Sequence, residues 1–243
     1  VNVTKAIIFS CDIFFYNLSV MLGIRKIDTM LEKFGFGSKT NIDLNEEKSG
    51  TVASPELKRA HGGHWYIGDT VNSAIGQGMM STTPLQLANA VAIIANRGKH
   101  FTPHLFMKTA GSNSITPLNG DDAVVLKDPK IWDTIINAMH GVVTSIDQPG
   151  TGYYHFGGNT KYMVAAKTGT AQLYRHTHID ETSSYDESKT PKKLRNDSLF
   201  IAFAPMDKPK IAIAVIVENN SIAANVARKV MDYYFNEDHQ TNK

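Results

Sequence analysis

The first third of the chain contains two short segments with apolar residues at helical spacing, followed by a long polar stretch. Apolar residues recur every three or four positions over residues 10–22 and again over 27–34, which predicts two short amphipathic helices. Gly35 ends the second helix, because glycine readily adopts the backbone conformation that follows a helix. Residues 36–82 are rich in Gly, Ser, Asn and His without such a period, so we expect irregular structure there.

Two longer helices are predicted from their start signals. Thr-Pro-Leu-Gln at residues 83–86 offers a capping threonine, a proline in the first turn and a glutamine three positions after the cap. The helix that follows should end at Gly98, and Asp-Pro at 128–129 begins another. The expected buried faces are formed by Leu87, Val91 and Ile94 in the first helix and by Ile131, Ile135, Met139 and Val142 in the second.

The last third of the chain changes to strand-forming segments. Residues 161–173, 199–204 and 211–218 are rich in apolar and β-branched residues, which predicts three antiparallel strands. A turn with two prolines at 205–209 joins the last two as a hairpin. A final helix over 221–235 should bury its apolar residues at helical spacing, which are Ile222, Val226, Val230 and Tyr233.

The order of these elements, with helices first and strands later, indicates an α+β arrangement. Its helical part would cover residues 1–160, and its sheet part with the closing helix would cover residues 161–236. With 243 residues, of which 42% are hydrophobic, the chain is long and apolar enough to fold around a core. The net charge of +2 is too small to indicate nucleic acid as a partner.

The stretch Lys-Thr-Gly-Thr at residues 167–170 follows an apolar run inside a predicted strand. It does not indicate nucleotide binding, because a phosphate loop needs its lysine directly after a glycine at a strand-to-helix turn. Alternation along a strand puts Thr168 and Thr170 on one side and leaves the other side bare at Gly169. Two hydroxyl groups and the charge of Lys167 suit a carboxylate, and an edge strand can pair with an extended peptide. The alternative is a threonine-rich strand end with a solvated lysine.

A second pair of polar residues, Ser10 and Asp12, starts the first predicted helix. Ser-x-Asp upstream of Lys-Thr-Gly corresponds to the second and third elements of a serine acyl-transferase set whose first element is Ser-x-x-Lys. Further segments occur in the order found in one family, namely SCDIFFYNL, KFGFGSKTNIDLNEEKSG, HWYIGDTVNSAIGQG, TPLQLANAVAIIANRG, AAKTGTAQ, and FIAFAP followed by IAIAVIVEN. The chain thus resembles the transpeptidase domain of class B penicillin-binding proteins, most of all the elongation-type penicillin-binding protein 2 group. This resemblance implies a serine β-lactamase/transpeptidase-like fold, in which helices flank an antiparallel sheet beside a helical lobe.

The same resemblance implies a peptidoglycan D,D-transpeptidase, which cross-links stem peptides through an acyl-serine intermediate and is inhibited by β-lactams. Ser10 would relay a proton near the catalytic lysines and also cap its helix, and Lys167 would donate a hydrogen bond to it. At the position of Asp12 many relatives carry Asn, whereas elongation-type members carry Asp, as this sequence does. The substrate would be bound by Thr168, Gly169 and Thr170, the last of which would supply an oxyanion-hole N–H.

The nucleophile motif of this family is not found in the sequence, since no Ser is followed by Lys three positions later. In the family this motif lies upstream of Ser-x-Asp, and the sequence opens at Val1 without Met. By this resemblance we expect residues 1–243 to be the C-terminal portion of a single transpeptidase domain within a longer protein, with about half of the active site and only three of the five strands of the sheet. Such a piece should not react with penicillin on its own, and segment 211–218 should have an unpaired edge that invites another chain.

The chemistry of this family requires no cofactor, and Cys11 is a candidate metal ligand, whereas the pairs His61/His64 and His176/His178 are expected to be solvated. As the single cysteine, it cannot form an internal disulfide, so it is either a small buried residue or a zinc ligand whose partners lie upstream. The implied partners are stem peptides, β-lactams and cell-elongation proteins. The implied location is the periplasmic side of the inner membrane, although no apolar run approaches the roughly 18 residues of a membrane span. Two other functions stay open: a serine β-lactamase, and a non-catalytic module that binds peptides or a partner protein.

Overall fold

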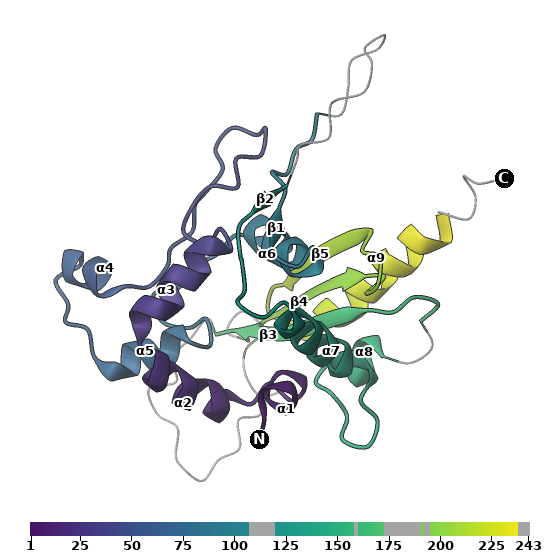
Figure 1. Ribbon diagram of the computed structural model, residues 1–243, viewed down its shortest axis with the longest axis horizontal. Helices are drawn as coiled ribbons and strands as arrows, with labels where there is room; N and C mark the ends of the chain where they lie inside the picture. The colour runs from purple at the N-terminus through teal and green to yellow at the C-terminus, as the bar shows by residue number, and fades with distance from the viewer. Residues whose placement is uncertain (107–119, 158–159, 173–190, 192–194, 238–243) are drawn as a thin grey trace.

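The computed structural model describes residues 1–106, 120–157, 160–172, 191 and 195–237 of the chain. Its elements in chain order are α1 (Val3–Ile8), α2 (Asp12–Leu22), α3 (Ile24–Lys33), α4 (Pro55–Ala60), α5 (Ile67–Ser73), α6 (Pro84–Ala95), β1 (Lys99–His100), β2 (Asp121–Asp122), α7 (Lys130–Thr144), α8 (Tyr153–Phe156), β3 (Ala165–Ala171), β4 (Asp197–Ala204), β5 (Ile211–Val217) and α9 (Ala223–Glu237). Figure 1 shows a helical lobe, made by α2 to α5, beside the sheet of β3, β4 and β5. Within the described residues, none of the helices combines the length and the apolar content that crossing a bilayer requires.

The sheet has the order β3-β4-β5 with both pairs antiparallel, so the predicted strands and their hairpin are confirmed. Lys167 of β3 lies opposite Ile201 of β4. Because side chains alternate along a strand, Lys167 and Gly169 share the face of Ile201, while Thr168 and Thr170 belong to the opposite face. β3 and β5 are the two edges of the sheet in the described part of the chain.

Helices cover both faces of this sheet and bury an apolar core on each side. On one face, α9 packs on β4 and β5, and α8 packs against α9 and reaches β4 through Phe156; the buried residues there include Ala166, Phe200, Ala202, Phe156, Ala227 and Met231. On the other face lie α6 and α7, and the buried residues there include Ala165, Phe203, Val91, Ile93, Trp132, Ile136 and Met139. The layered α+β arrangement predicted from the order of the elements is therefore confirmed.

The stretch 36–82, which we expected to be irregular, contains two short helices, so that expectation is wrong in part. α4 begins after Ser54, whose hydroxyl accepts a hydrogen bond of 3.1 Å from the Leu57 N–H. α5 begins after Tyr66, whose N–H donates to the Asp69 carboxylate at 2.8 Å. Both helices are too short to show an apolar period, so only their capping residues could have marked them.

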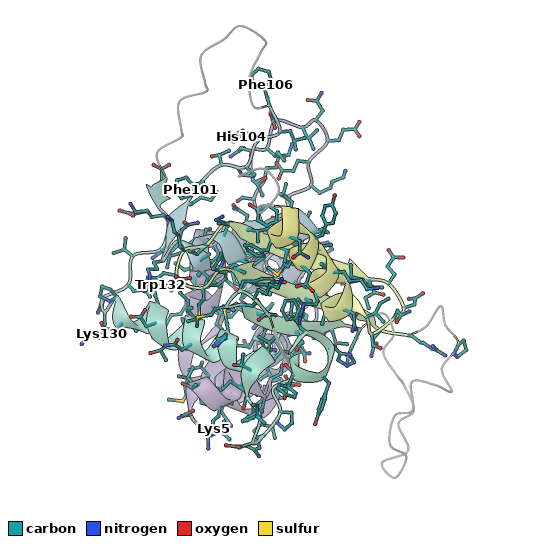
Figure 2. All side chains as sticks on the ribbon, turned by 90° about the vertical axis from the view of Figure 1, so that its right-hand side faces the viewer. Lys5, Phe101, His104, Phe106, Lys130 and Trp132 are labelled. Carbon is teal, nitrogen blue, oxygen red and sulfur yellow. The ribbon has the colours of Figure 1, made fainter. Side chains whose placement is uncertain are left out.

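The buried face of α7 is rotated from the predicted one. Met139 and Val142 are buried as expected, but Ile131 is 43% exposed and Trp132 is buried in its place. Figure 2 shows Lys130 at the outside of the molecule and Trp132 closer to its interior. An indole ring removes more apolar area from water than an isoleucine does, so the helix turns Trp132 toward the sheet.

The buried face of α9 also differs from the prediction. Val230 and Tyr233, expected to be inward, are 44% and 64% exposed, whereas Ala227 and Met231 are fully buried. Small alanine side chains allow a helix backbone to lie close to the sheet, and Met231 then fills the remaining space. The apolar period alone pointed to the larger side chains and so to the wrong side of the helix.

Candidate active site

Ser10 lies in the turn between α1 and α2, with a backbone φ of 51°. The Cys11 N–H donates to the Ala6 carbonyl at 2.9 Å, and the Ser10 N–H donates to the Ile7 carbonyl at 3.4 Å. These two bonds form the motif that commonly ends a helix with one residue in the left-handed region. The predicted capping role of Ser10 is therefore wrong: Cys11 precedes the first turn of α2, and Ser10 closes α1 instead. As a result, the Ser10 hydroxyl is free to point away from the helix end.

Lys167 brings its amine to this hydroxyl from the edge strand β3. Its Nζ donates to the Ser10 Oγ at 2.9 Å and to the Thr168 carbonyl at 2.9 Å, so two residues separated by 157 positions meet. Burial lowers the pKa of the Lys167 ammonium from its usual 10.5 to about 8, and the Asp12 carboxylate opposes that shift. The amine is thus positioned by two acceptors and loses its proton more easily than a solvated lysine.

Both groups open into one groove of about 750 Å³. It lies between the turn that carries Ser10, the residues that follow α5, and the edge of β3. Its lining includes every residue of the predicted site except Cys11, namely Ser10, Asp12, Lys167, Thr168, Gly169 and Thr170. Asp12, Gly169 and Thr170 are exposed there, whereas Lys167 and Thr168 are half-buried. The groove therefore joins a perturbed amine, a hydroxyl and the outer edge of β3.

Two further residues of the groove were missed by the analysis of motifs. The Thr151 and Thr168 hydroxyl groups share a hydrogen bond of 2.7 Å, and the Gln77 side chain donates to the Thr170 carbonyl at 3.1 Å. Both come from loops, Thr151 before α8 and Gln77 after α5. The glycines beside Gln77 were the available signal, since they mark a tight turn whose tip can face a cleft.

Cys11 is half-buried and does not line the groove. Among the described residues, no group of three His, Cys, Asp or Glu side chains converges as a metal site would require. The described part of the chain therefore does not supply the ligands that a zinc ion at Cys11 would need. A zinc site completed by residues beyond this sequence stays a prediction.

Comparison with known proteins decides the family. Residues 1–232 match the penicillin binding protein transpeptidase domain. The chain belongs to this family. A curated relative, the peptidoglycan D,D-transpeptidase MrdA of Salmonella typhimurium, is 40% identical over 243 residues, which cover 96% of the chain and 38% of the relative. The MrdA of Acinetobacter baumannii is 40% identical over 96% of the chain and 34% of the relative.

Solved structures show the same fold. PBP2 of Pseudomonas aeruginosa, solved in complex with WCK 5153, has a TM-score of 0.80 and 36% identity over 96% of the chain and 49% of that protein. PBP2 of Helicobacter pylori, solved in complex with MreC, has a TM-score of 0.81 and 30% identity over 97% of the chain and 40% of that protein. The resemblance to class B, elongation-type members is thereby confirmed, and so is the transpeptidase-like α+β fold. The chain spans well under half the length of the curated relatives named above.

Proposed function

We propose that the protein carrying this chain is a peptidoglycan D,D-transpeptidase that works through an acyl-serine intermediate. The observation that carries the proposal is the 2.9 Å hydrogen bond from the Lys167 amine to the Ser10 hydroxyl, in a groove that Thr168 and Thr170 also line. The relatives in Salmonella and Acinetobacter bear this activity in their names. Since the chain matches 38% of the Salmonella relative, the activity is proposed for the whole protein.

Lys167 and Ser10 would form a proton-transfer pair. A serine hydroxyl is a weak nucleophile at neutral pH and needs a base within hydrogen-bond reach. With a pKa of about 8, roughly a tenth of the Lys167 side chains are neutral at pH 7. The amine could then accept and return a proton through Ser10. The attacking serine would belong to a Ser-x-x-Lys motif, which the given sequence does not contain.

The strand edge would bind the substrate, a stem peptide that ends in D-Ala-D-Ala. The Thr168 and Thr170 hydroxyls would hold the terminal carboxylate, and the Thr170 N–H would meet the oxyanion. The serine oxygen attacks the carbonyl carbon of the penultimate residue, the C–N bond breaks, and D-alanine leaves with the proton returned to its amine. An amine from a neighbouring stem peptide then attacks the ester, which forms the cross-link and restores the serine.

Partners and location follow from the same family membership. We infer that the protein meets cell-elongation proteins, which is supported by the Helicobacter PBP2 that was solved in complex with MreC. We also infer a position at the inner membrane with the groove on the periplasmic side, where stem peptides are cross-linked. β-Lactams would acylate the same serine, because their strained amide takes the place of the peptide bond.

The test uses the full-length protein from the native gene and a fluorescent penicillin. One label per molecule that persists is expected, whereas rapid release of the label would indicate a β-lactamase. Ser10→Ala should slow labelling by roughly 10²-fold or more, because acid–base catalysis contributes about 10²–10⁴-fold. Ser49→Ala is the matched control, since Ser49 is exposed and outside the groove. A full-length protein that takes no label would refute the proposal. Residues 1–243 alone should stay unlabelled.

A further inference from the structure

Among the described residues no strand pairs with the outer edge of β3, and each of the two carbonyl groups that this edge presents to the groove accepts a hydrogen bond from a side chain. The Thr168 carbonyl accepts from the Lys167 Nζ at 2.9 Å, and the Thr170 carbonyl accepts from the Gln77 Nε2 at 3.1 Å. In an antiparallel strand the N–H and C=O of every second residue point away from the paired strand. Thr168 and Thr170 are therefore the residues whose backbone groups an added strand would use.

Gln77 reaches this edge from a turn that is held in place. The turn follows α5, and its two flanking glycines have left-handed φ values, 76° at Gly76 and 78° at Gly78. The Gln77 N–H donates to the Asn72 carbonyl at 2.9 Å, which fixes the backbone. The carboxamide lines the same groove as Ser10 and Lys167, and the side chain is half-buried. The donor at Thr170 thus comes from the opposite wall of the groove, and the two residues are 93 positions apart in sequence.

A carboxamide N–H and a peptide N–H are the same kind of hydrogen-bond donor. An extended acyl donor that pairs with the β3 edge needs the Thr170 carbonyl as the acceptor for its own amide N–H. In the structure the Gln77 carboxamide donates to that carbonyl. Because the contact is a single bond between neutral groups at a half-buried site, displacing it requires little free energy.

We propose that Gln77 occupies the amide-binding position of the acyl-donor site and must leave the Thr170 carbonyl when a ligand with a matching N–H binds. The inference rests on the proposed transpeptidase function and adds a specificity residue to it. Ligands that bring an amide N–H to Thr170 compete with Gln77, and ligands without one do not. Gln77 therefore lowers the acylation rate of the first class of ligand only.

The experiment compares two β-lactams on the full-length protein. Benzylpenicillin carries an acylamino N–H beside its lactam ring, and a carbapenem with a hydroxyethyl group lacks it. Gln77→Met keeps the length of the side chain and removes the donor. We expect the second-order acylation rate constant of benzylpenicillin to rise about 2- to 10-fold, the factor for one neutral hydrogen bond, and that of the carbapenem to stay the same. Gln148→Met is the control, because Gln148 is exposed and outside the groove.

Two outcomes would overturn the inference. Equal changes for both ligands would show a merely structural role for Gln77, and slower benzylpenicillin acylation would show that Gln77 assists the ligand. Gln77→Ala is the second variant, used if Gln77→Met shifts the thermal midpoint, and the same comparison of ligands applies to it. A wild-type protein that neither β-lactam acylates would instead refute the proposed function, so the two failures are distinguishable.

Discussion

Replacing Lys167 by methionine should stabilise the fold at neutral pH while it removes the amine from the groove. Methionine has a similar length and carries no charge, so the apolar part of the side chain keeps its place on β3. The Ser10 hydroxyl loses its donor, and acylation should stop. The amine that the chemistry needs is held in a poorly solvated position, where its protonated form disfavours the folded state.

The size of this effect follows from the pKa. Burial lowers the pKa of Lys167 from 10.5 to about 8, and each pKa unit corresponds to about 1.4 kcal/mol. The folded protein therefore binds this proton about 3 kcal/mol more weakly than the unfolded chain does. Below pH 8 the full cost is present in the wild-type protein. As the pH rises from 8 to 10.5, the unfolded state alone still binds the proton, so the wild type gains stability and the cost disappears.

Denaturant unfolding of wild type and Lys167→Met between pH 7 and 10.5 measures this difference. The advantage of the variant in free energy of unfolding should shrink by about 3 kcal/mol across that window. Packing changes add a constant that does not vary with pH, so they cannot imitate the slope. Lys130→Met is the control, since Lys130 is exposed at the start of α7. A stability difference that stays constant over this pH range would refute the reasoning.

Two other predictions concern Asp28 and Thr151. Asp28 is 7% exposed, its carboxylate oxygens have no hydrogen-bond partner among the described residues, and burial raises its pKa from 3.8 to about 6. Stability is therefore lost as the pH rises through 6. Asp28→Asn should raise the free energy of unfolding by roughly 2–3 kcal/mol at pH 7 but little at pH 4, which urea unfolding can measure. A gain equal to that of the exposed control Asp147→Asn at both pH values would contradict this prediction. Thr151→Val removes the hydrogen-bond partner of the Thr168 hydroxyl and should slow penicillin acylation of the full-length protein about 2- to 10-fold. The control Thr144→Val, at an exposed site, should leave the acylation rate unchanged. Equal acylation rates for both variants would count against a positioning role of Thr151.

Local signals carried enough information for the strands and for the helix that starts at Thr83. The capping box expected there is present, because Thr83 and Gln86 each accept a hydrogen bond from the backbone of the other. The antiparallel hairpin of β4 and β5 also follows from its two apolar runs and the prolines between them. These features depend on neighbours in sequence, which is why the sequence alone predicts them.

The orientation of helices on the sheet depends on partners that are distant in sequence. In α9 the larger apolar residues suggested one face, yet Ala227 and Met231 are the ones that reach the core. Which face of α9 is buried depends on how its side chains fit against β4 and β5, and the sequence of the helix alone does not show that fit. The same holds for Gln77, whose contact with Thr170 depends on how the helical lobe sits beside the sheet.

The two motifs of the site predict which residues form it but not how they are arranged in space. Ser-x-Asp and Lys-Thr-Gly identified the residues, but their convergence depends on the way α1 ends and on what holds it. The Ile8 carbonyl accepts a hydrogen bond of 3.3 Å from the Thr151 N–H, and a Cβ added to Gly141 of α7 would lie only 2.6 Å from the Ile8 side chain. The turn that carries Ser10 is thus held by α7, which packs against Ile8, and by the loop of Thr151, whose hydroxyl also bonds to Thr168. The loop at Thr151 therefore couples both halves of the groove, so the geometry of the Lys167 amine and the Ser10 hydroxyl is set by residues outside either motif.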